Sequence, residues 1–312
     1  MDRNLALEFV RVTEAAAIAS AGWLGRGNKH AADQAAVDAM RDRFNFIDFS
    51  GEVVIGEGTK DQAPELYIGE KLGNGNGAEF DIAVDPLECT DSVANGKPNA
   101  MSVVATGAKG ALFKAPDTYM DKIACGPAAK GAVDLDASVE ENIGRVAEKL
   151  KKHISEMVLV ALDRDYNKET IEEIRRVGAR VLLISDGDVA GAIATCLPDS
   201  GIDLLIQKGA SAEGVLAAVA IKCLGGDFQG RLSPKNEEHL ARAKAMGIED
   251  VGRKLSMEDL ARGEDLTFTA SGVIDGPLLK GVRYSGGYCV THSVVMRVRS
   301  GTLRFLETRH RV

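Results

Sequence analysis

The sequence is poor in aromatic residues and in proline: Phe, Trp and Tyr make up 5% of its 312 residues, and eight residues are proline. Because 45% of the residues are still hydrophobic, we expect a globular core formed mainly by Ala, Val, Ile and Leu. No apolar run approaches the length that spans a membrane. The N-terminus leads directly into a helical pattern and not into a signal segment. We therefore expect a cytoplasmic protein without a membrane partner.

The cysteines and the basic residues lack the patterns of several functional classes. The five cysteines form no CxxC pair, which argues against a disulfide framework and against a thiolate zinc site. The formal net charge is −8 and no block of Lys and Arg stands out, so we expect no nucleic-acid partner, because neutralising a phosphate backbone needs a concentrated basic surface. A small anionic substrate is compatible with this charge, since metal ions can supply the local positive charge.

The apolar patterns of the first half predict alternating short elements. The whole chain contains 34 glycines, which suggests many tight turns between short elements, as in α/β proteins. Helical spacing and short apolar runs predict helices over 3–23 and 31–43, strands over 52–55 and 81–84, and a strand pair over 101–106 and 110–114.

In the second half, strands and helices alternate more regularly. We expect helices over 138–152, 168–177, 189–196, 212–223 and 236–245, and strands over 157–162, 179–184, 202–206, 266–269, 281–284, 291–299 and 302–307. This alternation predicts a mainly parallel sheet with helices on both faces. The chain should therefore form two packed α/β lobes, 1–140 and 141–312, with the C-terminal strands in the second lobe.

Carboxylates follow several of the predicted strands. The residues in these positions are Glu57, Asp85, Asp186, Asp188 and Glu213. Carboxylates that converge at strand ends repel one another unless a cation lies among them, and Mg²⁺ and Mn²⁺ prefer such oxygen ligands. The pattern therefore predicts a site for divalent metal ions.

The segment from Asp85 to Thr90 combines the most chemical groups. We expect Asp85 to end a strand, Pro86 to stiffen the turn, and Glu88 to share or bridge a metal ion. The Thr90 hydroxyl can hold a water, and the amides of Cys89 and Thr90 can open a helix, where phosphate binds readily. Two metal ions at such a site would activate a water and stabilise the leaving oxygen. The alternative is an ordinary turn in which Asp85 caps a helix.

Further motifs accompany this segment in order along nearly the whole chain, at 7–14, 25–27, 32–33, 54–58, 63–64, 66–70, 81–86, 115–117, 119–120, 129–131, 186–189 and 213–215. Together they resemble the class II fructose-1,6-bisphosphatases, which belong to the inositol-monophosphatase-like, lithium-sensitive phosphatases. The resemblance implies a layered α/β sugar-phosphatase fold. It also implies hydrolysis of the 1-phosphate of fructose 1,6-bisphosphate to fructose 6-phosphate, a reaction of gluconeogenesis, by a homodimer or homotetramer.

The resemblance also implies roles for individual residues. The metal ligands, for Mn²⁺ or Mg²⁺, would be Asp33, Glu57, Asp85, Glu88 and Glu213. Thr90 matches the hydroxyl near the attacking water, and Asp61 matches an acidic residue beside it. Lys29 would meet the phosphate, with a solvated surface lysine as the alternative. The remaining substrate contacts would be Glu88, Cys89, Thr90, Tyr119, Arg164, Asp165, Tyr166, Asp186, Gly187 and Asp188.

Four departures from the family's pattern fall in this site. Cys89 replaces a glycine, Thr59 replaces a glutamate, and Ser211-Ala212 stand where a single proline usually precedes the glutamate. The largest departure is at 163–167, where Asp-Arg-Asp-Tyr-Asn replaces Asp-Arg-Pro-Arg-His. The missing arginine would grip a phosphate bidentately, which Tyr166 cannot do. We therefore expect a changed substrate preference, for example for sedoheptulose 1,7-bisphosphate, or else a weakly active or non-catalytic sugar-phosphate-binding paralogue.

A different phosphatase class offers a second interpretation of the same stretch. Asp163 and Asp165 follow an apolar run and form the DxD motif of haloacid-dehalogenase-type phosphatases, in which the first aspartate is a nucleophile. The motif lies in the middle of the chain, however, and Asn167 stands where Thr or Val is usual. Such short motifs arise easily by chance, so this interpretation is the weaker one.

Overall fold

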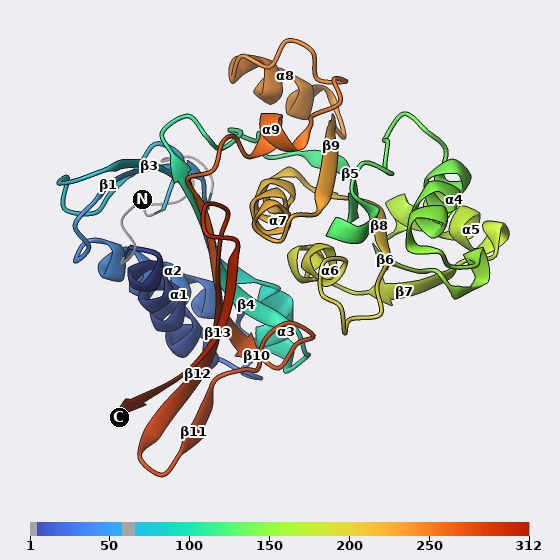
Figure 1. Cartoon of the computed structure of the whole chain (residues 1–312). Coiled ribbons are helices and arrows are strands. Elements are labelled where there is room, and N and C mark those ends of the chain that lie inside the picture. Colours follow the sequence, from blue (N-terminus) through green and yellow to red (C-terminus); the bar gives the residue numbers. More distant parts are fainter. Residues whose placement is uncertain (1–4, 58–65, 312) are drawn as a thin grey trace. The chain divides into compact units, whose positions relative to one another are not determined.

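The structure is a computed structural model that describes residues 5–57 and 66–311. The chain divides into two compact units (Figure 1). Unit 1 comprises Met1–Leu112 and Gly263–Val312, and unit 2 comprises Phe113–Arg262. All five cysteines lie in the described ranges and are free thiols, as expected from their spacing. In those ranges, no helix combines the length and the apolar character needed to cross a membrane.

Unit 1 is built on an eight-stranded sheet in the order β11-β12-β10-β4-β3-β1-β2, with β13 paired to β12. Its strands are β1 (Ser50–Ile55), β2 (Lys71–Leu72), β3 (Glu79–Glu88), β4 (Ala100–Ala108), β10 (Leu266–Ile274), β11 (Arg283–Ser285), β12 (Tyr288–Arg297) and β13 (Thr302–Arg311). β1 and β3 run parallel, and β3 and β4 run antiparallel. β1 and β3 therefore end at the same edge of the sheet.

The helices of unit 1 are α1 (Leu5–Ala21), α2 (Lys29–Phe44) and α3 (Thr90–Asn95). α1 and α2 lie side by side against the sheet (Figure 1). Four phenylalanines pack together beneath these two helices. The ring of Phe9 meets the ring of Phe49 edge-on, with centroids 5.4 Å apart, and Phe44 and Phe80 complete the cluster. These four phenylalanines fill the core beneath the two helices.

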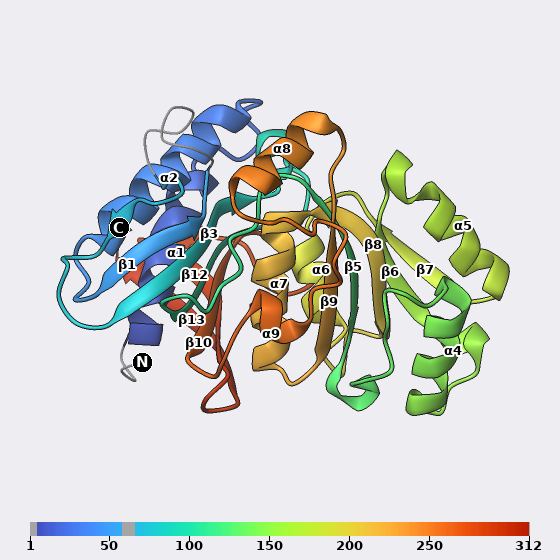
Figure 2. The same ribbon diagram turned by 90° about the horizontal axis from the view of Figure 1, so that it is seen from above.

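Unit 2 contains a five-stranded sheet in the order β7-β6-β8-β5-β9 (Figure 2). The strands are β5 (Tyr119–Cys125), β6 (Val158–Leu162), β7 (Arg180–Ile184), β8 (Leu204–Ala210) and β9 (Asp227–Ser233). β6 runs parallel to β7 and β8, as the alternation of strands and helices predicted, whereas β5 runs antiparallel to β8 and β9. The sheet is therefore mixed, with its parallel part at β7-β6-β8.

Helices cover both faces of this sheet. They are α4 (Val139–Leu150), α5 (Lys168–Val177), α6 (Asp188–Ala194), α7 (Ser211–Cys223), α8 (Glu237–Ala245) and α9 (Met257–Leu260), with 3-10 turns η1 (Pro127–Ala129), η2 (Ile154–Glu156) and η3 (Asp165–Asn167). Figure 1 shows α4 and α5 on one side of the sheet and α6 and α7 on the other. The predicted two-sided α/β layer is confirmed.

Most predicted elements are present, and the exceptions have local causes. Residues 110–114, all of which the structure describes, form a turn and a bridge residue instead of the predicted strand. There the backbone N–H of Leu112 donates to the carboxylate of Asp81, 3.1 Å away. This N–H is therefore not used for pairing with a neighbouring strand. β5 and β9 were not predicted, because charged and polar residues such as Lys122 and Gln229 interrupt their apolar pattern.

The boundary between the units differs from the predicted division into 1–140 and 141–312. β10 pairs with β4 over Leu266–Ile274, so the C-terminal strands complete the sheet of unit 1 and do not join the second lobe. β5, which lies before residue 140, belongs to the sheet of unit 2. Pairing between strands so far apart in the chain leaves no local signal in the sequence.

Candidate functional site

Two of the predicted carboxylates of unit 1 lie at the shared edge of β1 and β3. Ile55 stands opposite Ala83 in the parallel register, so Glu57 and Asp85 each lie two residues further along. Both residues are half-buried. The backbone N–H of Glu57 donates to the carbonyl of Leu66 over 3.1 Å, which holds the chain close to the strand end. Parallel strands therefore bring these two carboxylates to one edge, where α/β sheets commonly bind ligands.

The segment after Asp85 differs from the expected turn. β3 does not end at Asp85 but continues to Glu88, with an irregularity in its pairing to β4 between these two residues. Pro86 lies at this irregularity because it has no N–H to give to the ladder. α3 then begins at Thr90, as expected, and its N-cap is Cys89, which makes no side-chain cap. The alternative in which Asp85 caps the helix is wrong.

Cys89 adopts a conformation that glycine adopts most easily. Its φ is 69° and its ψ is 50°, in the left-handed region, where a Cβ meets the following carbonyl. The side chain is buried and packs in the core cluster that also contains Leu87 and Val93. The glycine that is usual at this position in the family thus has a conformational reason, and Cys89 bears the strain.

The start of α2 lies beside α3. The Lys29 ammonium is 3.3 Å from Oδ1 of Asp91, and both side chains are largely exposed. The backbone N–H groups of Gly25 and Gly27 donate to carbonyls of α3, over 2.8 and 2.9 Å. Asp33, in the first turns of α2, is half-buried, and burial raises its pKa while His30 opposes the rise. Lys29 and Asp33 are thus placed near the helix that opens at Thr90.

Asp61, predicted as an acidic residue beside the attacking water, and Thr59 lie outside the described residues. The remaining predicted residues all belong to unit 2.

Three predicted substrate residues, Tyr119, Arg164 and Tyr166, lie close together in unit 2. Tyr119 lies at the start of β5, and its ring centroid is 5.0 Å from that of Tyr166 in η3. Burial raises the pKa of the Tyr166 hydroxyl, and Tyr119 adds to the rise, whereas the charge and hydrogen bond of Arg164 oppose it. Tyr166 therefore occupies its position by packing on Tyr119. Asp165 differs: its side chain is 91% exposed and pairs with Lys168 over 2.7 Å.

Asn167 fixes the η3 turn that carries these residues. Its amide donates to the carbonyls of Leu162 and Lys208 over 3.2 and 3.0 Å, and its carbonyl oxygen accepts the backbone N–H of Lys208 over 2.7 Å. The side chain is buried between the ends of β6 and β8. In the sequence Asn167 stood out as a departure from the family's pattern and as a mismatch to the DxD motif, and its structural role was missed.

A buried polar cluster lies between β5, β8 and the starts of α6 and α7. The Lys122 ammonium is 2.5 Å from Oδ2 of Asp188, and the Gln207 amide donates to the same oxygen over 3.3 Å. Asp188 opens α6 after Gly187, whose φ of 82° requires glycine in this turn. Lys122 and Gln207 were not predicted as site residues. The available signal was the pair Asp121 and Lys122 inside a run that is otherwise largely apolar and ends at Cys125.

Glu213 borders this cluster from the first turn of α7. Burial, followed by the charge of Asp188, raises its pKa to about 7; Lys122 opposes the rise, and Asp186 adds a smaller contribution to it. Its Oε2 atom is buried and has no hydrogen-bond partner in the part of the chain that the structure describes. Such a group resembles a metal ligand, because an acceptor without a donor is costly to bury and a hard cation satisfies it.

The predicted metal ligands are divided between the two units, with Glu213 in unit 2 and the other four in unit 1. Among residues 5–57 and 66–311, no three His, Cys, Asp or Glu side chains lie close enough together to hold one ion. All five predicted ligands are carboxylates, and the buried Oε2 of Glu213 fits an oxygen-ligated divalent ion. The donor set does not distinguish Mn²⁺ from Mg²⁺.

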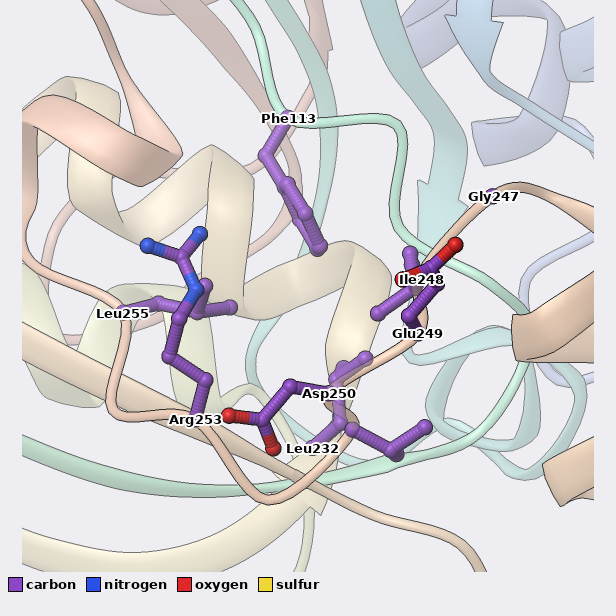
Figure 3. A pocket seen from close by; sticks show the side chains of 9 residues that line it. Phe113, Leu232, Gly247, Ile248, Glu249, Asp250, Arg253 and Leu255 are labelled. Atoms are coloured by element: carbon purple, nitrogen blue, oxygen red, sulfur yellow. The ribbon is translucent and has the colours of Figure 1, made fainter.

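A separate cavity of about 220 Å³ lies in unit 2, away from the predicted residues. Figure 3 shows Phe113 on one side of it and Leu232 and Asp250 on the other. Arg253, which also lines the cavity, pairs with Asp259 over 3.0 Å. None of its lining residues is a predicted site residue, so we assign no function to it.

Comparison with known proteins decides the family. Residues 3–310 match the model of the bacterial, glpX-encoded fructose-1,6-bisphosphatases. The class 2 fructose-1,6-bisphosphatase of Haemophilus influenzae is 46% identical, over 99% of this chain and 97% of the relative. Fructose-1,6-bisphosphatase 1 class 2 of Escherichia coli K12 is 45% identical, over 99% and 96%. The chain belongs to the class 2 fructose-1,6-bisphosphatase family.

Family membership confirms the resemblance that the sequence motifs indicated, and with it the α/β fold and a phosphatase activity. The match includes Asp163 and Asp165, so the haloacid-dehalogenase interpretation is not supported.

Proposed function

We propose that this chain hydrolyses the 1-phosphate of fructose 1,6-bisphosphate to yield fructose 6-phosphate. The observation that carries the proposal is the match to class 2 fructose-1,6-bisphosphatases along almost the full length of both chains. The reaction belongs to gluconeogenesis and would take place in the cytoplasm. The substrate is a small sugar phosphate, and no nucleic acid or membrane is involved.

The proposed metal ligands for Mn²⁺ or Mg²⁺ are Asp33, Glu57, Asp85, Glu88 and Glu213. Bound divalent ions would neutralise phosphate charge and lower the pKa of a water. The raised pKa values of Asp33 and Glu213 support this assignment, because in both cases the largest cause is loss of hydration, which a bound cation would offset. The unpartnered Oε2 of Glu213 supports it independently.

The other residues of unit 1 would orient the reacting groups. The Thr90 hydroxyl, at the start of α3, would hold the attacking water, and Asp61 would accept a hydrogen bond from it. The Lys29 ammonium would bind the phosphate in place of Asp91, and its exposure makes that exchange inexpensive. The backbone at Glu88 and Cys89 would approach the same phosphate.

The residues of unit 2 would bind the sugar and its second phosphate. We assign the sugar to Tyr119, Tyr166 and the turn formed by Asp186, Gly187 and Asp188. Arg164 would supply the positive charge for the second phosphate. Asp165 points to Lys168 and to solvent, so its contribution would be the smallest of this group.

The test is a steady-state assay of phosphate release from fructose 1,6-bisphosphate with added Mn²⁺ or Mg²⁺. We expect turnover that EDTA abolishes. Glu213→Gln should lower kcat/KM about 100-fold or more, because it removes a charged metal ligand. Glu172→Gln, an exposed carboxylate on α5, is the matched control and should retain the wild-type rate. Turnover that persists in EDTA would contradict the metal assignment.

A changed sugar preference is the second candidate, and the packing of Tyr166 on Tyr119 favours it, because Tyr166 stands where the resembled family has a second arginine. Here kcat/KM should be higher for sedoheptulose 1,7-bisphosphate than for fructose 1,6-bisphosphate. An efficiency for the fructose substrate above roughly 10⁴ M⁻¹s⁻¹ would rule this candidate out. A chain that binds Mn²⁺ but hydrolyses no sugar phosphate would instead be a non-catalytic paralogue.

For the oligomeric state we propose a homodimer or homotetramer. Sedimentation equilibrium gives the mass directly, and a monomer at micromolar concentration would contradict the proposal.

A further inference from the structure

Lys122 is a buried lysine for which the reaction outlined above has no use. It lies in β5 on the face of the sheet that α6 and α7 cover, and it is 2% exposed. Gln207 of β8 and Gly230 of β9 stand directly opposite it. A buried ammonium is costly unless a partner of opposite charge and further hydrogen bonds compensate for lost hydration.

The partner of Lys122 is one oxygen of Asp188. The ammonium is 2.5 Å from Oδ2 of Asp188, and the Gln207 amide reaches the same oxygen over 3.3 Å. Oδ1 takes part in neither of these contacts. The Lys122 ammonium and the Gln207 amide, from neighbouring strands, thus both hold Oδ2 of Asp188, a residue that is 7% exposed. Fixing Oδ2 also sets the direction in which Oδ1 points.

The surrounding backbone is shaped to admit this pair. A Cβ at Gly209 would lie 2.5 Å from Oδ2 of Asp188 and 3.0 Å from the Lys122 ammonium. A Cβ at Gly214 would lie 3.6 Å from Cε of Lys122 and 2.7 Å from the sulfur of Met120. β8 and α7 therefore approach the pair so closely that an added methyl group at Gly209 would displace it.

The same ammonium also acts on Glu213. Asp188 and Glu213 are close enough to interact electrostatically, and Lys122 lowers the pKa of Glu213 where Asp188 raises it. The charge of Lys122 thus acts on both Asp188, a proposed sugar-binding residue, and Glu213, a proposed metal ligand. Apolar side chains usually stabilise such a buried position as well as an ion pair does, so stability alone does not explain a lysine here.

Building on the proposed function, we propose that Lys122 is a positioning residue: with Gln207 it holds Oδ2 of Asp188 so that Oδ1 accepts a hydrogen bond from a hydroxyl of the sugar. Lys122 itself does not touch the substrate. Its removal should therefore weaken sugar binding much more than it slows the chemical step at the phosphate.

Three variants test this role. Lys122→Met keeps the stem and removes the charge, and we expect KM for fructose 1,6-bisphosphate to rise about tenfold or more while kcat changes by less than roughly threefold. Gly209→Ala changes no charge but displaces Oδ2, and it should raise KM in the same way. The affinity of the metal-free protein for fructose 6-phosphate, measured by calorimetry, should fall by about the same factor in both variants.

Lys152→Met is the matched control. Lys152 is 2.5 Å from Oδ1 of Asp203, whose side chain is as buried as that of Asp188, with 8% exposed in each case. This variant also leaves a buried aspartate without its lysine, but far from the proposed sugar residues in the fold of unit 2. It should lower stability and leave KM and the affinity for fructose 6-phosphate within about twofold of wild type.

The decisive measurement is a double-mutant cycle with Asp188→Asn. If Lys122 acts through Asp188, Lys122→Met should raise KM no further in the Asp188→Asn background. Additive effects on KM, or a Lys122→Met variant with wild-type KM, would overturn the inference and leave the proposed function intact. If Lys122→Met does not fold, two other variants test the inference. They are Gly209→Ala and the double variant of Lys122→Met with Asp188→Asn, which carries no buried charge at either position. A wild-type chain without turnover would overturn the proposed function, and this inference with it.

Discussion

Cys89 combines a buried side chain with a backbone conformation that disfavours any side chain. Its φ of 69° places Cβ against the following carbonyl, at a cost of about 1–2 kcal/mol. The thiol packs in the core of unit 1, which offsets part of that strain. The two contributions are separable, because alanine keeps Cβ and glycine does not.

We predict that Cys89→Gly is more stable than Cys89→Ala by about 1 kcal/mol, since only glycine removes the clash. Both variants lose the thiol, so its packing cancels in the comparison. The free energy of unfolding in urea measures the difference. The control is Lys151, which has a φ of 56° and follows α4. Lys151→Gly should be more stable than Lys151→Ala by a similar amount, and this comparison does not involve the core. Equal stabilities at position 89 would show that the surrounding backbone relaxes.

Glu213 makes the stability of the metal-free protein depend on pH. Its pKa is raised from 4.5 to about 7 in the folded chain, so between these values the folded state keeps a proton that the unfolded state has lost. Stability should therefore fall as pH rises through this window and stay low above it. Glu213→Gln removes this effect.

We thus expect Glu213→Gln to be more stable than wild type at pH 8 by about 1–3 kcal/mol in EDTA, with a smaller difference at pH 5. Urea unfolding at both pH values measures it. The exposed control Glu172→Gln should stay within about 0.5 kcal/mol of wild type. A wild type that gains stability relative to Glu213→Gln as pH rises would contradict the assignment of the raised pKa.

At the scale of helices and strands, the sequence predicted elements with a strong period and missed those with a broken one. α5 was predicted with its observed bounds, since Ile171 and Ile174 recur at helical spacing and Gly178 ends the helix. β5 was missed because Asp121 and Lys122 stand in the middle of a strand whose two faces are both covered. One of these two residues is Lys122, the buried lysine proposed above to position Asp188. Polar residues with local function thus disturb the periodicity that predicts the fold.

Asn167 links β6 and β8 to the turn that carries Arg164 and Tyr166. Asn167→Ala should lower the free energy of unfolding by about 2–4 kcal/mol, because it leaves the carbonyl of Leu162 and both backbone groups of Lys208 without their hydrogen bonds. We also expect KM for the sugar phosphate to rise, since η3 loses its anchor. Urea unfolding and steady-state kinetics measure the two effects.

The control for this prediction is Asn142 of α4, whose buried side chain is also bonded to the backbone, at Asp134 and Ser138. Asn142→Ala should cost a similar stability without changing KM. If Asn142→Ala raises KM as much as Asn167→Ala does, general loosening of unit 2 would explain both, and Asn167 would have no special link to the substrate turn.

At the scale of the molecule, the sequence indicates candidate site residues but not the pairings between distant segments that surround them. Glu57 and Asp85 stood out because each follows a predicted strand, and the structure places both toward the same end of the parallel pair β1 and β3, with Asp85 inside β3. The assignment of β10 to the sheet of unit 1 and the burial of Gln207 against Asp188 depend on pairings between distant segments. Contacts of that kind leave no mark on the local pattern of either partner.

Metal binding should be visible in the stability of the whole chain. The proposed ligands are carboxylates, and the unfolded chain offers no assembled site for an ion. Addition of Mn²⁺ at about 100 times its dissociation constant should therefore stabilise the protein by roughly 2.7 kcal/mol and raise Tm by several degrees. Differential scanning calorimetry measures the shift, and EDTA should reverse it.

Glu213→Gln should show less than about half of the wild-type shift at equal Mn²⁺, whereas Glu172→Gln should show all of it. Equal shifts in all three proteins would mean that the stabilising ion binds elsewhere and would remove Glu213 from the ligand set.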